Sequence, residues 1–84
     1  MTPAKPSPLS QEARIASRHA AGAGVAAMQR LGLKEGTVRV NANHVCQYCQ
    51  RGLPELLNPG ETLYIFYDGP GFYKATKAGV ELIK

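Results

Sequence analysis

The sequence lacks the long apolar run of a membrane span and the many cysteines of a disulfide scaffold. It has no tryptophan and only two cysteines among 84 residues. It also has no run of about 20 apolar residues such as a membrane helix requires. Two cysteines are too few for the disulfide framework of many small secreted domains. The first residues lack the apolar segment of a signal peptide. We therefore expect no membrane span and no signal peptide, and metal or redox chemistry explains the cysteines better.

Acidic residues are also few, with six against ten basic residues and a formal net charge of +4. This moderate basic excess is compatible with a polyanionic partner such as nucleic acid. At this length burial alone stabilises a fold only marginally, and a metal or a partner often helps. Pro3, Pro6 and Pro8 mark residues 1–9 as a disordered lead or linker. We expect residues 10–84 to form one domain.

Helix and strand signals alternate after this lead. Ser10 is a suitable N-cap for a first helix. Gly32 is suited to end the second helix, and Asn58-Pro59-Gly60 is a strong turn. Alternation of helices and strands with short connections predicts an α/β fold, a compact sheet covered by helices. The predicted helices are 11–18, 19–31 and 46–57, and the predicted strands are 37–41, 62–67, 72–76 and 79–84, the last being either a strand or a tail.

Four local features carry more specific expectations. Residues 34–36 are predicted to form a turn, and Pro54 should kink or interrupt its helix. The segment 62–67 is apolar without strict alternation, which suggests a strand buried on both faces. Gly22 and Gly24 each cost a helix about 1 kcal/mol relative to alanine. Their presence suggests close packing or a ligand near the backbone.

The cysteines and one histidine have the spacing of a metal site. Cys46 and Cys49 are three residues apart at the start of a predicted helix, so both sulfurs lie on one face. A helix N-terminus favours the thiolate form that binds metal. Zinc binds cysteine and histidine readily, and three protein ligands leave a fourth position for water. His19, at the start of the other helix, is the natural third ligand. A zinc-bound water becomes a usable nucleophile near neutral pH.

Two alternatives to this open site remain at this point. A closed structural Cys2His2 site would also use His44, which lies two residues before Cys46, and would explain how so small a domain is stabilised. The pair Cys46-x-x-Cys49 could instead be redox-active, although His19 would then have no role.

The two ligand segments resemble the zinc-dependent nucleobase deaminases, which have a histidine, a glutamate two residues later and a downstream Cys-x-x-Cys. Here the segments read His19-Ala20-Ala21-Gly22 and Cys46-Gln47-Tyr48-Cys49. The sequence is most similar to bacterial toxin deaminases that act on cytosine in DNA, in particular the double-stranded-DNA cytosine deaminase toxin family. The likeness extends over residues 19–68. Within that range it also involves Met28, Gly32, Glu35-Gly36, Asn41, Leu53-Pro54-Glu55 and Leu57-Asn58-Pro59.

The resemblance implies a zinc ion bound by His19, Cys46 and Cys49. It places Ala21 at the position of the general acid/base glutamate, which transfers a proton from the zinc-bound water to the base. Alanine cannot do this, and loss of such a group typically costs about 10²–10⁴-fold in rate. The favoured interpretation is a deliberate Glu→Ala substitution that inactivates the enzyme. There are two alternatives: the chain is a natural inactive relative, or Ala21 is simply a small residue in an alanine-rich helix.

The resemblance also implies a set of substrate contacts. Asn41 would hold the sugar of the target nucleotide, although an asparagine here also suits a strand end. Ala20 and Val45 would offer backbone groups to the base edge, and His44 would lie at the pocket rim or in an exposed loop. Tyr67, Phe72 and Tyr73 flank the loop 68–71 and would contact the neighbouring nucleotide, with base stacking as the chemistry. Phosphate contacts are expected from Arg39, Arg51, Lys74 and Lys77, for which a solvated surface is the alternative.

The implied reaction is the hydrolytic conversion of cytosine to uracil in DNA. The implied source is the toxin domain of a secreted bacterial effector, which would act in the cytoplasm of a target cell and need an immunity protein as partner. The sequence departs from the family at Val45, where a proline or a longer loop is usual, and it has no room for the β-hairpin that precedes the histidine helix. This is therefore either a minimal or truncated deaminase, or one whose missing strands are supplied by another chain. The alternative functions are an RNA or free-nucleoside deaminase and a non-catalytic, zinc-stabilised nucleic-acid-binding module.

Overall fold

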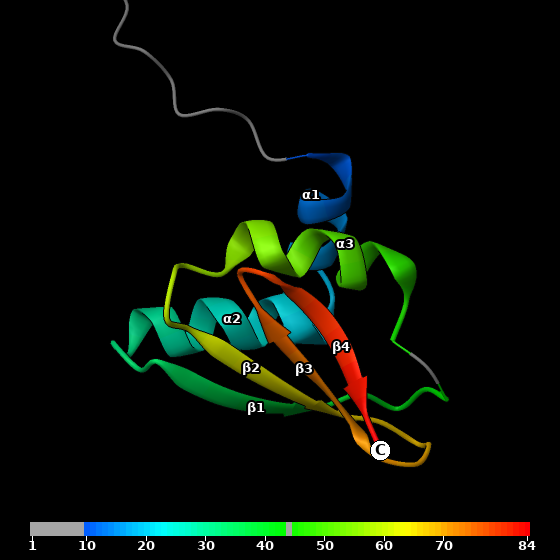
Figure 1. Cartoon of the computed structure of the whole chain (residues 1–84). Coiled ribbons are helices and arrows are strands. Elements are labelled where there is room, and N and C mark those ends of the chain that lie inside the picture. The colour runs from blue at the N-terminus through cyan, green and yellow to red at the C-terminus, as the bar shows by residue number, and fades with distance from the viewer. Residues whose placement is uncertain (1–9, 44) are drawn as a thin grey trace, which may run out of the picture.

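Helices cover one face of a four-stranded sheet in the computed structural model, which describes residues 10–43 and 45–84 (Figure 1). This arrangement confirms the α/β fold. The described helices are α1 (Gln11–Ser17), α2 (Ala20–Arg30) and α3 (Gln47–Leu56). The strands are β1 (Glu35–Arg39), β2 (Thr62–Phe66), β3 (Phe72–Thr76) and β4 (Gly79–Ile83). The predicted disordered lead, residues 1–9, lies outside the described residues.

The strand order β1-β2-β3-β4 follows the sequence, and β1 and β2 are parallel while the other neighbours are antiparallel. Helix α3 makes the connection between the two parallel strands, as parallel pairing requires a crossover. Because β1 and β2 are parallel, the segments that follow them leave the sheet at the same edge. The Asp68 N–H donates to the Ala42 carbonyl over 2.8 Å and joins these two segments. Within the described residues no strand precedes α2.

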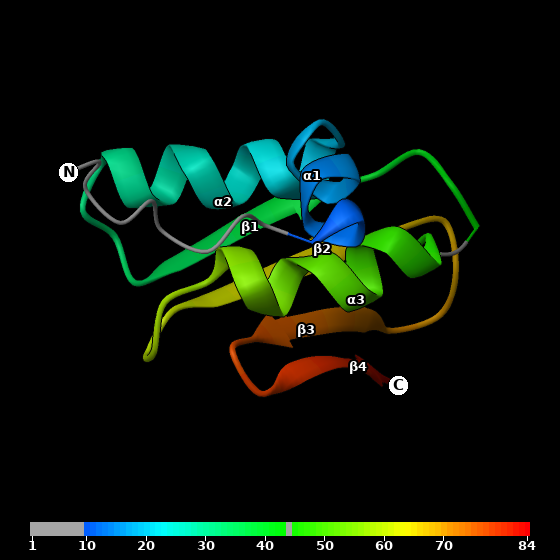
Figure 2. The same ribbon diagram turned by 90° about the horizontal axis from the view of Figure 1, so that it is seen from above.

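The core lies between the sheet and the helices. On β2, Leu63 and Ile65 are fully buried, whereas Phe66 is 41% exposed. Burial therefore alternates along β2, and the expectation that this strand is buried on both faces is wrong. The reason is that the helices all lie on the same side of the sheet, as the view from above shows (Figure 2).

Helix α1 packs tightly against both longer helices because glycines stand at the contacts. A Cβ atom at Gly22 of α2 would lie 1.9 Å from the Ala16 carbonyl oxygen, and one at Gly52 of α3 would lie 2.5 Å from the Glu12 carbonyl oxygen. Close packing is thus confirmed as the role of Gly22. Helix α1 is capped as predicted by Ser10, whose hydroxyl accepts from the Ala13 N–H.

Two local expectations are wrong. Strand β1 begins at Glu35, so residues 34–36 do not form a separate turn; parallel pairing with β2 extends the strand backwards, with Glu35 opposite Thr62. Helix α3 runs through Pro54 to Leu56 without interruption. Packing against the rest of the fold offsets the cost of the missing proline N–H, since Leu53 beside it is fully buried.

Candidate metal centre and adjoining pocket

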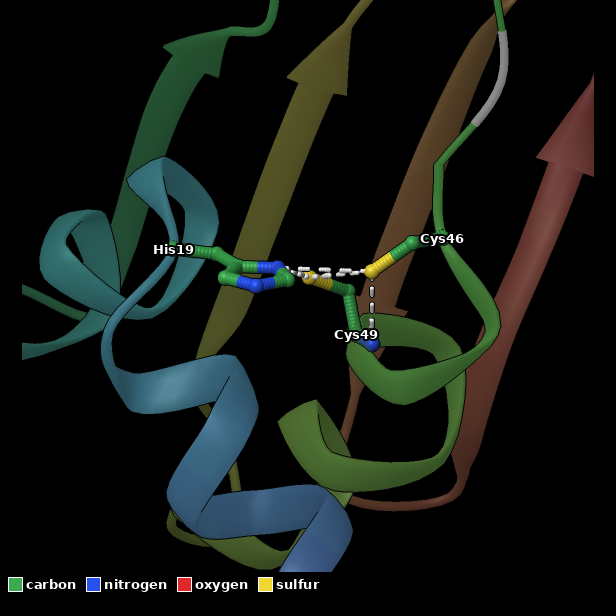
Figure 3. Close-up of side chains that lie close together, drawn as sticks. All are labelled: His19, Cys46 and Cys49. Carbon is green, nitrogen blue, oxygen red and sulfur yellow. Dashed lines mark hydrogen bonds between the residues drawn. The ribbon is translucent and has the colours of Figure 1, made fainter.

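Two helix N-termini bring the metal-ligating side chains together. His19 is the N-cap residue of α2, and Cys46 is the N-cap residue of α3. The sulfur of Cys46 accepts a hydrogen bond from the Cys49 N–H, as serine or aspartate oxygens do at other helix starts. The predicted helix starts are thereby confirmed. Helix α1 contacts both helices, and the side chains of His19, Cys46 and Cys49 point toward one another (Figure 3).

The three ligand atoms form a compact triangle. The Nδ1 atom of His19 lies 3.3 Å from the sulfur of Cys46 and 3.3 Å from that of Cys49, and the two sulfurs are 3.4 Å apart. Tetrahedral zinc with bonds of about 2.3 Å to sulfur would hold two sulfurs about 3.8 Å apart. A shift of a few tenths of an ångström would therefore suffice. The donor set of one imidazole and two thiolates is one that zinc prefers, and these residues can hold a metal ion.

The two sulfurs differ in their surroundings. Cys49 is 4% exposed, whereas Cys46 is half-buried. Burial, together with the hydrogen bond and charge of Cys46, raises the pKa of the Cys49 thiol to about 12. Without a metal ion the Cys49 thiol is therefore protonated at neutral pH. A cation at the centre of the triangle reverses this preference, because thiolate is the form that binds metal.

A pocket of about 450 Å³ opens beside the ligand triangle. It lies where the segment after β1 meets the start of α2 and the residues before α3. The predicted contacts Ala20, Asn41 and Val45 are all in its wall, next to the ligands His19 and Cys46. The remaining lining residues are Arg39, Val40 and Ala42. Val40 and Ala42 are not predicted as pocket residues, because the sequence does not show that the end of β1 lies beside the start of α2.

Ala21 is buried, with 1% of its surface exposed, and belongs to the core cluster that also contains Val45 and Cys49. It lies in the first turn of α2, two residues after His19. Among the described residues that line the pocket there is no aspartate or glutamate. The described pocket thus offers metal ligands, an amide and a guanidinium, but no carboxylate for proton transfer.

The aromatic residues of the predicted set lie elsewhere. Tyr67 and Tyr73 face the helices, with ring centroids 5.0 Å apart. The Tyr67 hydroxyl donates to the Pro70 carbonyl over 2.7 Å, inside the loop that follows β2. Phe72 lies on the opposite face of the sheet. None of the three lines the pocket, and their contact with a neighbouring nucleotide stays a prediction. His44 lies outside the described residues, so its predicted roles also stay predictions.

A family model described as SCP1.201-like deaminase matches residues 2–81 of the chain. The chain belongs to the SCP1.201-like deaminase family. The match includes both ligand segments and nearly the whole fold. No curated protein and no solved structure matches the chain significantly.

Membership in the SCP1.201-like deaminases confirms the expected enzyme class, and the ligand triangle agrees with it. Of the contacts predicted for the base and sugar, the structure gathers Ala20, Asn41 and Val45 at the pocket. None of the helices in the described part of this SCP1.201-like deaminase is long and apolar enough to cross a membrane.

Proposed function

We propose that this deaminase binds one zinc ion through His19, Cys46 and Cys49 and that its reaction is the hydrolysis of cytosine to uracil in DNA. The observation that carries the proposal is the triangle of one imidazole nitrogen and two sulfurs, 3.3–3.4 Å on each side, at the wall of a pocket. A zinc ion held by three protein ligands supplies an acidified water that can attack C4 of the base.

The pocket residues have separate roles in this proposal. Backbone groups of Ala20 and Val45 orient the base edge, and the Asn41 amide holds the sugar. These assignments are supported by the position of all three residues in the pocket wall beside His19 and Cys46. A base bound there would lie beside His19 and Cys46, two of the residues that would hold the metal ion. Arg39, whose side chain is 63% exposed, contacts a phosphate of the DNA.

Residue 21 is the position of the proton-transferring group in this proposal. Alanine at this position, and the lack of a carboxylate among the described lining residues, support a protein that binds substrate but converts it slowly. The expected deficit is about 10²–10⁴-fold relative to a chain with a carboxylate there. The substitution Ala21→Glu supplies that carboxylate from the first turn of α2.

Ala21→Glu therefore tests the proposal. Zinc-loaded protein is incubated with single-stranded DNA, duplex DNA and RNA, and converted cytosines are identified by sequencing. We expect conversion of DNA by Ala21→Glu and none by Ala23→Glu, a matched control that adds the same charge at an exposed position of α2. Ala21→Glu combined with Cys46→Ala should also be inactive. A folded, zinc-loaded Ala21→Glu protein that converts no base in any of the three substrates would contradict the proposal.

A non-catalytic nucleic-acid-binding module is the second candidate, favoured by the same lack of a carboxylate. Conversion by Ala21→Glu distinguishes the two functions, because a module evolved only for binding would not align a water with the base.

The proposal extends to a toxin that is secreted, acts inside a target cell and requires an immunity protein. Its support is the resemblance of the ligand segments to toxin deaminases. Expression of Ala21→Glu in the cytoplasm of a bacterium should arrest growth and create C-to-T mutations, whereas Ala23→Glu should do neither.

A further inference from the structure

One face of the sheet carries no helix among the described residues (Figures 1 and 2). Alternation along the strands gives this face Tyr64 and Phe66 from β2 and Phe72 from β3. Phe66 is 41% exposed, and Tyr64 and Phe72 are half-buried. Aromatic rings of this size normally contribute to a core. Their position on an uncovered face therefore needs a reason.

The three rings form one cluster, which we call the aromatic face. The ring centroids of Phe66 and Phe72 are 5.7 Å apart, and those of Tyr64 and Phe72 are 6.0 Å apart. Neighbouring aromatic residues on adjacent strands of an open four-stranded sheet are the arrangement on which RNA-recognition motifs stack two or three bases. The stacking itself is tolerant of sequence, because every base presents a π-face.

The aromatic face is continuous with the pocket through Arg39. This residue lies opposite Phe66 in the β1–β2 register and also lines the pocket. Its guanidinium bonds the Asp68 carboxylate over 2.7 Å, with the two side chains 63% and 49% exposed. Exposed ion pairs contribute little, so the guanidinium can exchange this carboxylate for a phosphate at small cost.

A second cation lies among the rings. Lys74 is opposite Tyr64 in the β2–β3 register and is two residues after Phe72, so its side chain projects from the same face. Its neighbour on β4 is Glu81, which projects from the same face, but the two side chains form no ion pair among the described residues. Arg39 and Lys74 thus lie beside the rings, with Asp68 and Glu81 as their respective acidic neighbours. In proteins that bind single strands, cations contact the phosphate backbone and aromatic rings stack on the bases.

We propose that the aromatic face binds the nucleotides that flank the target base of single-stranded DNA, with Arg39 on a phosphate where the strand leaves the pocket. This inference rests on the proposed function and adds to it a binding surface that lies outside the pocket. The strand must be single, because the bases of a duplex are stacked on each other and cannot lie on these rings.

Binding of a fluorescent single-stranded oligonucleotide to the zinc-loaded chain tests the inference by anisotropy. Phe66→Ala should raise Kd about ten-fold, since one stacked base is lost. Phe66→Tyr should retain the affinity and Phe66→Leu should not, because stacking needs a ring and not merely apolar surface. Arg39→Gln should reduce the slope of log Kd against log salt concentration by about 0.7, the value for one phosphate contact with a single strand.

Leu82→Ala is the matched control. Leu82 is 38% exposed, a fraction similar to the 41% of Phe66. It lies opposite Tyr73, however, and therefore projects from the helix-covered side of the sheet. Its variant should bind the oligonucleotide as the unaltered chain does. Equal affinity of Phe66→Ala and the unaltered chain, retained affinity in Phe66→Leu, or duplex binding with the same dependence on Phe66 would each overturn the inference.

A second copy of the chain on this face would give a different result. Sedimentation would then show a dimer that Phe66→Ala dissociates, and this too would overturn the inference.

Failure of this inference is distinguishable from failure of the proposed function. If Ala21→Glu converts cytosine and adding Phe66→Ala to that variant does not raise its KM for the oligonucleotide, the aromatic face is excluded while the reaction stands. If binding depends on Phe66 and Ala21→Glu converts nothing, the reaction is excluded instead.

Discussion

Gly22 lies so close to Ala16 that a Cβ atom on Gly22 would be 1.9 Å from the Ala16 carbonyl oxygen. The contact joins α1 to the first turn of α2, three residues from His19, one of the residues proposed to bind the metal. A similar contact joins Gly52 of α3 to Glu12 of α1. The two glycines therefore allow α1 to hold both ligand-bearing helices together.

Gly22→Ala should destabilise the fold even though alanine is the better helix former. The methyl group meets backbone, which cannot move aside, and overpacking of this kind typically costs about 1–3 kcal/mol. Gly24→Ala is the matched comparison in the same helix, because its methyl group meets the Cγ1 atom of Val38, a side-chain atom, and not backbone. The urea midpoint should fall more for Gly22→Ala than for Gly24→Ala. The reverse order would show that α1 does not pack as described.

One zinc ion per chain is expected from metal analysis, and its removal should lower Tm. A ligand at about 100 times its Kd stabilises the native state by about 2.7 kcal/mol, which corresponds to about 11–22 °C for a domain of this size. His19→Ala and Cys46→Ala should lose the metal and show no further effect of a chelator. His44→Ala should keep it, because the proposed site has three protein ligands. Loss of zinc from His44→Ala would favour the closed Cys2His2 site.

The sequence was sufficient for the fold class and for the ligand triangle because both depend on local signals. Ser10, His19 and Cys46 each begin a helix, and helix starts have recognisable residues. The spacing of the two cysteines fixes their relative position within α3. Only the meeting of His19 with the cysteines depends on the tertiary fold; the position of His19 at a helix start suggested it, and the family resemblance implied it as well.

Other features depend on pairings that the sequence does not encode locally. Every residue from Leu63 to Tyr67 is apolar or aromatic, so the period of burial along β2 cannot be read and the open face was missed. Arg39 reaches the pocket because β1 and β2 are parallel and end at one edge. Gly52 was not singled out, since its neighbour α1 is distant in sequence.

Metal affinity should fall as the pH falls. The pKa of the Cys49 thiol in the metal-free protein is raised to about 12, mainly by burial, so this thiol carries a proton that the metal must displace. Each displaced proton weakens binding about ten-fold for every unit by which the pH is lowered below that pKa. Competition with a chelator of known affinity between pH 7 and 9 measures the slope, which should be at least one proton per metal. A flat profile would show that Cys49 is not a ligand.

Glu61 links the turn before β2 to α2, and this contact should make the fold sensitive to acid. Its carboxylate is 4% exposed and accepts hydrogen bonds from the Asn58 backbone N–H over 2.8 Å and from the Gln29 amide over 2.7 Å. The Asn58 bond foremost, and then the Gln29 bond, hold the pKa of Glu61 below its ordinary value.

A carboxyl group with a lowered pKa in the native state stabilises the fold above its unfolded pKa, and this stabilisation is lost as the pH falls through the native value. Glu61→Gln keeps the shape of the side chain but removes the charge. The variant should be less stable than the unaltered chain at pH 7, and the two urea midpoints should converge as the pH is lowered through the acidic range. Tyr48→Phe, an uncharged change on α3 away from this turn, should show the full acid dependence. A constant difference between Glu61→Gln and the unaltered chain at every pH would mean that the shape of the contact, and not its charge, stabilises the turn.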